Sequence, residues 1–362
     1  MNETVTASFL KLAKRVMRVF SCGNCGQTVY FENVKCENCG MALGFDPLNM
    51  AMQTLQLADG GQLQTGRAAG VPKTYCANYL NGICNWLVPV EYKGGFCLSC
   101  GMNKTIPDLS IPGNVERWFE IERAKRRLVY TLIKLGLPMT GPAGAGIPPL
   151  AFRIVANAKT GHENGLITLN IAEADPATRE STRAAMNEPY RTLLGHFRHE
   201  SGHYYWMLLV NNPQSIERYR QLFGDERTDY GKALAAYHQN GPTPDWLKNY
   251  ISAYATAHSW EDWAESWAHY LHMVDTLETA EDYKIEPRLP QQRAPVKPWF
   301  STTDPYQAGS AGQLMERWIP LALAMNSLNR SMGLADFYPF VVSPSVIAKL
   351  DFVHQIIRSR GR

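Results

Sequence analysis

Three things are missing from this sequence: long apolar runs, a large excess of one charge, and cysteines after residue 100. No apolar stretch in its 362 residues approaches the roughly 20 residues that span a bilayer, which argues against a membrane protein. Charged residues make up 19% of the chain and the formal net charge is +3, so the composition does not indicate nucleic acid as a main partner. The 45% hydrophobic content is enough for a sizeable core.

The N-terminus also lacks the pattern of a secretory signal. In MNETVTASFLKLAKRVMRVF the basic residues are interleaved with apolar ones, whereas a signal peptide has a charged start followed by an apolar block. Residues 1–18 are interpreted as an N-terminal extension. Cysteines grouped in CxxC pairs indicate metal binding in a reducing compartment, so we expect a cytoplasmic protein.

The first four cysteines form two CxxCG turns around a short β-prone run. They are Cys22, Cys25, Cys36 and Cys39. Each turn presents two thiolates, and two turns close a tetrahedral Cys₄ site for Zn²⁺. A redox-active CxxC is the alternative, but redox sites do not usually come as two facing pairs. Residues 19–45 are therefore predicted to be a zinc ribbon.

The other four cysteines have wider spacing. They are Cys76, Cys84, Cys97 and Cys100, and they fall within 25 residues. We expect them to hold a second Zn²⁺ in a module over residues 46–110, although the sequence leaves open an exchange of ligands between the two sets. Four thiolates leave no open coordination position, so both sites are predicted to be structural.

The central motif is HESGH, within a helix predicted over residues 188–210 with Pro189 in its first turn. His199 and His203 are four residues apart, so both imidazoles can hold one Zn²⁺. Glu200 lies beside the first ligand, where it can act as general base on a water at the metal. This is the H-E-x-x-H pattern of zinc metallopeptidases. The alternative is a buried helix whose histidines only form hydrogen bonds.

A second helix, predicted over residues 245–275, carries the missing ligand. Glu261 and Glu265 lie on one face, so one can complete a His₂Glu set while the other hydrogen-bonds a ligand imidazole. The structural alternative is a solvated acidic face. Trp260, Trp263 and Trp267 instead indicate that this helix is largely buried, and buried carboxylates need partners.

The HESGH helix followed by EDWAESW resembles the gluzincin metallopeptidases, whose second helix carries a Glu ligand. The resemblance implies that Glu261 is the third ligand and Glu265 its supporting carboxylate, and the reverse assignment stays open. Some gluzincins place a Tyr two turns before the third ligand to stabilise the oxyanion. Tyr254 has that spacing, and His258 is the alternative.

More closely, the chain resembles a bacterial family that is classed by motif as zinc-binding metallopeptidases. Its members join N-terminal zinc ribbons to a zincin-like domain with C-terminal helices. The segments that carry the resemblance are SCGNCG, KCENCG, RHESGHYYW, HSWEDWAESWAHYLH and NSLNRSMG, and it covers residues 19–355. It implies an α+β protein, with a mainly helical zincin-like domain and a small sheet over residues 111–362.

The remaining elements are predicted from hydrophobic period and from helix-stop signals. A helix over 114–136 carries a basic run that we expect on a solvated face. Strands over 151–156 and 165–171 would offer an edge to an extended peptide. Further helices are expected at 176–186, 216–223, 312–333 and 345–360, with a polar stretch over 225–241 and an irregular loop over 281–311.

Together these features predict a hydrolase that cleaves a peptide or amide bond in a peptide or protein substrate, with one catalytic and two structural Zn²⁺ ions. One alternative is a non-catalytic zinc scaffold that serves as a protein-interaction module. Glu200 argues against it, because a structural site needs no general base. The other alternative, a zinc-ribbon protein associated with nucleic acid, is disfavoured by the near-neutral charge.

Overall fold

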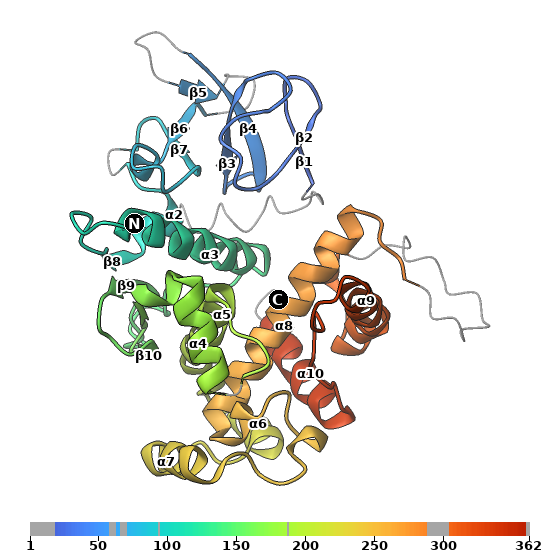
Figure 1. Ribbon diagram of the computed structural model, residues 1–362. Helices are drawn as coiled ribbons and strands as arrows, with labels where there is room; N and C mark the ends of the chain where they lie inside the picture. The colour runs from blue at the N-terminus through green and yellow to red at the C-terminus, as the bar shows by residue number, and fades with distance from the viewer. Residues whose placement is uncertain are drawn as a thin grey trace. The chain divides into compact units, whose positions relative to one another are not determined.

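The computed structural model describes residues 19–57, 63–65, 71–92, 95–186, 188–287 and 304–359. The predicted extension over residues 1–18 lies outside them. The chain forms two compact units, drawn in Figure 1. One comprises residues 1–136, 151–160 and 168–179, and the other comprises residues 137–150, 161–167 and 180–362.

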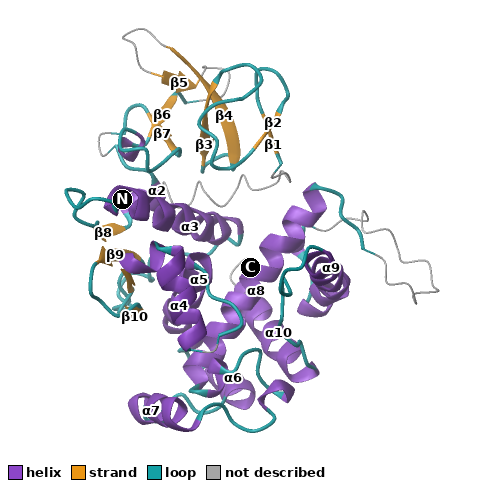
Figure 2. Cartoon of the chain, viewed as in Figure 1, coloured by secondary structure: helices purple, strands orange, loops and turns teal. Residues whose placement is uncertain are grey.

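Small antiparallel sheets make up the cysteine-rich part of the first unit (Figure 2). Their strands are β1 (Phe20–Ser21) with β2 (Thr28–Val29), then β3 (Ala42–Asp46), β4 (Ala51–Leu57) and β5 (Leu63–Thr65) in that order, and β6 (Lys73–Tyr75) with β7 (Leu87–Pro89). The rings of Phe45 and Trp86, both fully buried, lie 5.1 Å apart and join the first sheets to the second cysteine set. Gly44 is required here, because a Cβ would clash with the Leu87 side chain.

Helix α3 (Asn114–Lys134) also belongs to the first unit, after η2 (Ala77–Tyr79), α2 (Leu98–Gly101) and β8 (Asn103–Thr105). It confirms the helix predicted over 114–136, and Gly136 follows its end with φ +65°. The chain then returns in β9 (Ala151–Val155), which pairs in parallel with β8 and has β11 (Leu166–Asn170) on its other side.

The predicted solvated face of α3 is wrong for two of its basic residues. Lys125 and Arg126 are 0% and 2% exposed. Lys125 Nζ lies 2.7 Å from Glu122 and also donates to Asn103, while Arg126 donates to the carbonyl of Ile83. Buried charges need such partners, and two of them, Asn103 and Ile83, are distant in sequence and so could not be read from the basic run.

The two strand predictions at 151–156 and 165–171 are confirmed by β9 and β11. The structure adds β10 (Gly161–Glu163), between the two predicted strands. The short turn η3 (Ile171–Ala174) and helix α4 (Pro176–Ala185) follow, the latter where a helix was predicted.

The second unit is built of helices around α8 (Ser259–Asp282), which packs against α5 (Leu193–Tyr205), α9 (Ala311–Ser331) and α10 (Pro344–Arg358). Trp263 and Trp267 of α8 are fully buried, as their spacing predicted. Helix α6 (Ile216–Phe223) agrees with its prediction, whereas α7 (Tyr230–Asn240) lies in the stretch described only as polar. The observed architecture is the predicted one, a zinc-ribbon region followed by a mainly helical region with a small sheet.

Two helices begin later than predicted. Helix α5 starts after Thr192, whose hydroxyl accepts a 2.9 Å hydrogen bond from the Gly195 N–H, so Pro189 lies before the helix. It continues as a π-helical turn, η4 (Trp206–Val210). Helix α8 starts after His258, and the residues before it form the turns η5 (Trp246–Lys248) and η6 (Tyr254–Thr256).

The predicted loop over 281–311 falls mostly on residues 288–303, which lie outside the described part. It is followed by the turn η7 (Pro305–Gln307). Among the helices that the structure describes, none combines the length and the apolar character of a bilayer span.

Candidate metal centres and active site

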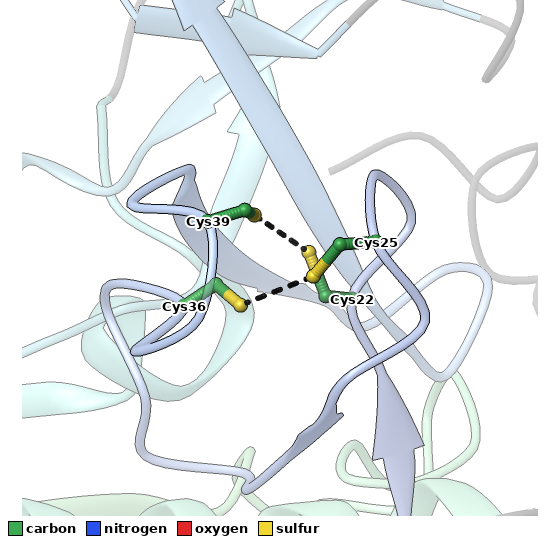
Figure 3. Close-up of side chains that lie close together, drawn as sticks. All are labelled: Cys22, Cys25, Cys36 and Cys39. Atoms are coloured by element: carbon green, nitrogen blue, oxygen red, sulfur yellow. Dashed lines mark hydrogen bonds between the residues drawn. The ribbon is translucent and has the colours of Figure 1, made fainter.

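The first cysteine set forms one compact cluster from two facing turns (Figure 3). The Sγ atoms of Cys22 and Cys39 lie 3.6 Å apart and those of Cys25 and Cys36 lie 3.7 Å apart. Thiolates about 2.3 Å from one tetrahedral Zn²⁺ are about 3.8 Å from each other, whereas a disulfide bond is about 2.05 Å long. The cluster therefore fits a zinc ion, and its cysteines are not in disulfides.

The second set gathers separately, so the exchange of ligands that the sequence left open does not occur. The Sγ atoms of Cys84 and Cys97 lie 3.7 Å apart, again a zinc-like spacing. The backbone N–H of Cys97 donates to Cys76 Sγ at 3.3 Å, which stabilises a thiolate there. All four of these cysteines are buried, whereas Cys25 of the first set is exposed.

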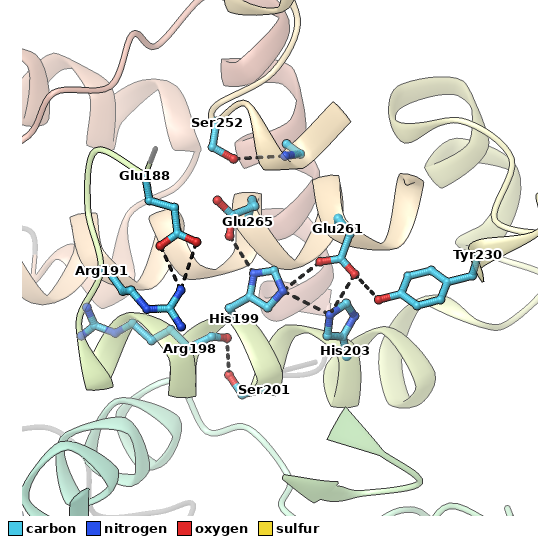
Figure 4. Close-up of polar contacts among 11 residues, drawn as sticks. Glu188, Arg191, Arg198, His199, Ser201, His203, Tyr230, Ser252, Glu261 and Glu265 are labelled. Atoms are coloured by element: carbon cyan, nitrogen blue, oxygen red, sulfur yellow. Dashed lines mark hydrogen bonds and ion pairs between the residues drawn. The ribbon is translucent and has the colours of Figure 1, made fainter. Parts of the chain in front are cut away.

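The third cluster joins helices α5 and α8 (Figure 4). His199 and His203 project from the same face of α5, and their Nε2 atoms lie 3.2 Å apart. Glu261 enters from α8, with Oε2 3.0 Å from His199 Nε2 and Oε1 3.6 Å from His203 Nε2. The three residues that the sequence singled out as a ligand set thus meet at one point.

These distances were compared with what a zinc ion requires. Two ligand atoms at about 2.0–2.1 Å from a tetrahedral Zn²⁺ are about 3.3 Å from each other. The observed separations of 3.0, 3.2 and 3.6 Å lie around that value. Glu261 is only 1% exposed, and a carboxylate so buried requires positive charge beside it. Two imidazoles and a carboxylate therefore fit Zn²⁺.

The pKa values of His199 and Glu261 also indicate that this cluster favours a positive charge. Burial alone would lower the pKa of His199, but its contacts with Glu261 and Glu265 outweigh this and raise the pKa well above the usual value. Burial lowers the pKa of His203 to about 4, which keeps its imidazole neutral and available as a ligand. Burial would raise the pKa of Glu261, but His203 and His199 together lower it to about 2.

Glu265 lies behind His199 and not beside the other two ligands. Its Oε1 is 2.6 Å from His199 Nδ1. A carboxylate only accepts, so Nδ1 carries the proton, which leaves Nε2 as the nitrogen that can bind a metal. A carboxylate that fixes a ligand imidazole in this way is a regular feature of zinc sites. The geometry favours Glu261 as third ligand and Glu265 as its support.

Comparison with known proteins identifies the family of the chain. The family described as "Putative zinc-binding metallo-peptidase" matches residues 114–356, and a zinc-ribbon domain family matches residues 19–111. The chain belongs to this zinc-binding metallopeptidase family. Its two four-cysteine clusters lie within the part that the zinc-ribbon family matches.

Relatives occur in mycobacteria. The "Uncharacterized protein Rv2568c" of Mycobacterium tuberculosis and the "Uncharacterized protein Mb2598c" of Mycobacterium bovis are each 41% identical over 347 residues, which cover 94% of this chain and 95% of theirs. No solved structure matches the chain.

The structure separates the two residues, Tyr254 and His258, that the sequence offered as oxyanion donors. His258 caps α8: its Nδ1 accepts from the Trp260 N–H at 3.1 Å, so its Nε2 carries the proton and donates to the Thr228 carbonyl. The ring of Tyr254 lies 5.9 Å from that of His199, and its hydroxyl forms no hydrogen bond with another described residue. Tyr254 is thus the candidate with an uncommitted donor.

Glu200 follows His199 on α5 and is half-buried. The charge of its carboxylate contributes to raising the pKa of both Tyr254 and Tyr230. Burial and the charge of Glu261 raise the pKa of Tyr254 far above its usual value, and Glu200 adds to this shift. The phenol therefore stays protonated and able to donate at neutral pH.

Two residues at the site were missed by sequence reasoning. Tyr230, at the start of α7, donates a 2.6 Å hydrogen bond to Glu261 Oε1. His162 of β10 lies parallel to the ring of His203, with centroids 6.3 Å apart, and burial lowers its pKa to about 4. The only local signal for Tyr230 is the preceding Asp229, a favourable N-cap before a run of helix-forming residues.

Proposed function

We propose that this protein is a zinc-dependent peptidase or amidase of the gluzincin type, acting in the cytoplasm on a peptide or protein substrate. The observation that carries the proposal is the meeting of His199, His203 and Glu261, with Glu200 on the adjacent position of the same helix. A structural zinc site needs a fourth protein ligand and no neighbouring base.

The ion would be held by His199, His203 and Glu261, and when bound it would supply Lewis-acid activation of a water molecule and of the scissile carbonyl. Glu200 takes a proton from the attacking water and passes it to the leaving amine. Tyr254 donates a hydrogen bond to the oxyanion that develops on the carbonyl. Glu265 keeps the His199 imidazole in the tautomer that can bind a metal.

The two cysteine clusters have a different task in this proposal. Each has four thiolates and no open position, so they stabilise the N-terminal region. That region presents or recognises the substrate.

The test measures zinc content and cleavage together. We expect three zinc ions per chain in wild type and in Glu200→Gln, and two in His199→Ala, one for each cluster that remains. A peptide library should be cleaved by wild type alone. Two ions in all three proteins would show that His199 and Glu261 do not form a metal site. Three ions without cleavage of any peptide would favour the scaffold alternative.

A further inference from the structure

Tyr230 is held in place by the same end of α8 that carries Glu261. Its ring packs edge-on against His258, at 5.3 Å, and lies 5.7 Å from Trp260. His258 in turn caps α8 and donates to the carbonyl of Thr228, two residues before Tyr230. The Tyr230 side chain and the first turn of α8 are therefore fixed to each other.

The two oxygens of Glu261 have different surroundings. Oε1 accepts the 2.6 Å hydrogen bond from Tyr230. Oε2 is buried, accepts no hydrogen bond from the described residues, and lies 3.0 Å from His199 Nε2. Figure 4 shows the phenol approaching the carboxylate from the side opposite His199. Oε1 therefore already accepts from Tyr230 and lies 3.6 Å from His203 Nε2, whereas Oε2 lies beside His199 and accepts no hydrogen bond from the described residues.

This difference matters because a carboxylate can bind a metal through one oxygen or through both. A catalytic zinc site has three protein ligands and needs its remaining position for water or substrate. If both oxygens of Glu261 bound the ion, the carboxylate would fill part of that space. Occupation of Oε1 by a strong hydrogen-bond donor opposes this binding mode.

We propose that Tyr230 is a positioning residue that restricts Glu261 to one metal-binding oxygen, Oε2, and so keeps a coordination position open. This inference rests on the proposed function, because it presupposes that His199, His203 and Glu261 bind zinc. It gives α7, in which no residue is fully buried, a specific link to the site.

The experiment compares Tyr230→Phe with a control, Tyr237→Phe. Both substitutions remove one phenol hydroxyl from α7. Tyr237 packs against Tyr254 at 5.6 Å, and its hydroxyl forms no hydrogen bond with another described residue. Zinc affinity of the third site is measured by competition with a chelator. Cobalt(II) is then placed in that site, because the intensity of its visible absorption bands falls when the coordination number rises.

For Tyr230→Phe we expect about 10- to 100-fold weaker zinc binding and weaker cobalt bands, since loss of a partner to a ligand typically has this effect on affinity. Tyr237→Phe should match wild type in both. A helical circular-dichroism spectrum and a cooperative thermal unfolding transition like those of wild type show that the second unit, which carries both substitutions, is folded. Wild-type affinity or an unchanged cobalt spectrum in Tyr230→Phe would overturn the inference. Failure of the proposed function would appear differently, as a third zinc ion missing from wild type itself.

Discussion

The indole N–H of Trp263 donates a 2.8 Å hydrogen bond to the backbone carbonyl of Gly202, the residue before the ligand His203. Helices α5 and α8 approach closely here, since a Cβ on Gly202 would lie 2.9 Å from the Cα of Ala264. The glycine of HESGH therefore serves helix packing. The same crossing brings Glu261, two residues before Trp263, to the two histidines.

Gly202→Ala should force α5 and α8 apart and destabilise the protein by about 1–3 kcal/mol, as overpacking in a core does. Zinc binding at the third site should weaken with it, because the ligands come from both helices. Thermal unfolding and chelator competition measure the two effects. The control is Gly312→Ala in α9, where the nearest atom to a new Cβ is 3.6 Å away. This variant should be neutral or slightly more stable, since Ala has the higher helix propensity.

Glu261→Gln and Glu265→Gln should differ in zinc binding. The first removes the charged ligand, so we expect two zinc ions per chain after dialysis. The second leaves all three ligands and weakens only the support of His199, so three ions should remain with affinity reduced about 10- to 100-fold. Metal analysis combined with chelator titration separates these results. Loss of the third ion only in Glu265→Gln would reverse the assignment of the two carboxylates.

Lys349→Met should destabilise the second unit strongly. Lys349 Nζ lies 2.6 Å from Asp262, and the two side chains are 4% and 1% exposed. Removing one member of a buried pair typically costs about 3–5 kcal/mol, because the other charge is left without a partner. The double variant Asp262→Asn/Lys349→Met should regain part of that free energy. Equal destabilisation in the single and double variants, measured in urea, would contradict a role for the unpaired carboxylate.

Zinc should leave the first cysteine cluster before the second when a thiol-modifying reagent is added. Cys25 is exposed and Cys39 partly so, whereas all four cysteines of the second cluster are buried. A chromogenic chelator should report a fast and a slow phase of zinc release. Cys25→Ser should abolish the fast phase and leave the slow one. A single phase, or loss of the slow phase in that variant, would contradict the expected order.

The sequence could predict which candidate ligands lie together where their geometry is local. CxxC turns and His residues four apart on a helix place their ligands together through backbone geometry alone, so the spacing is informative. The pair Glu261 and Glu265 could be assigned to one helix face in the same way. Which of them meets the histidines depends on how α8 crosses α5, and this required the structure.

Features that depend on distant contacts were missed or misassigned. The basic run of α3 follows the pattern of a solvated face, yet Lys125 is buried by partners that include Asn103. Tyr230 lies 31 residues before Glu261, in a polar stretch without hydrophobic period, and nothing local connects it to the metal ligands. His258 seemed a candidate for catalysis because of its position before Glu261. Its capping role becomes evident only from where α8 begins.

The burial of α3 also bears on how this protein evolved. Two separate families describe the chain, with the boundary between them just before Asn114. Helix α3 opens the part matched by the second family. Its buried Arg126 nevertheless donates a hydrogen bond to the carbonyl of Ile83, which lies in the part matched by the first. A gene rearrangement at that boundary would leave a cationic side chain with no partner in the interior. The two modules should therefore be inherited as one, as they are in the mycobacterial relatives that align over 94% of this chain.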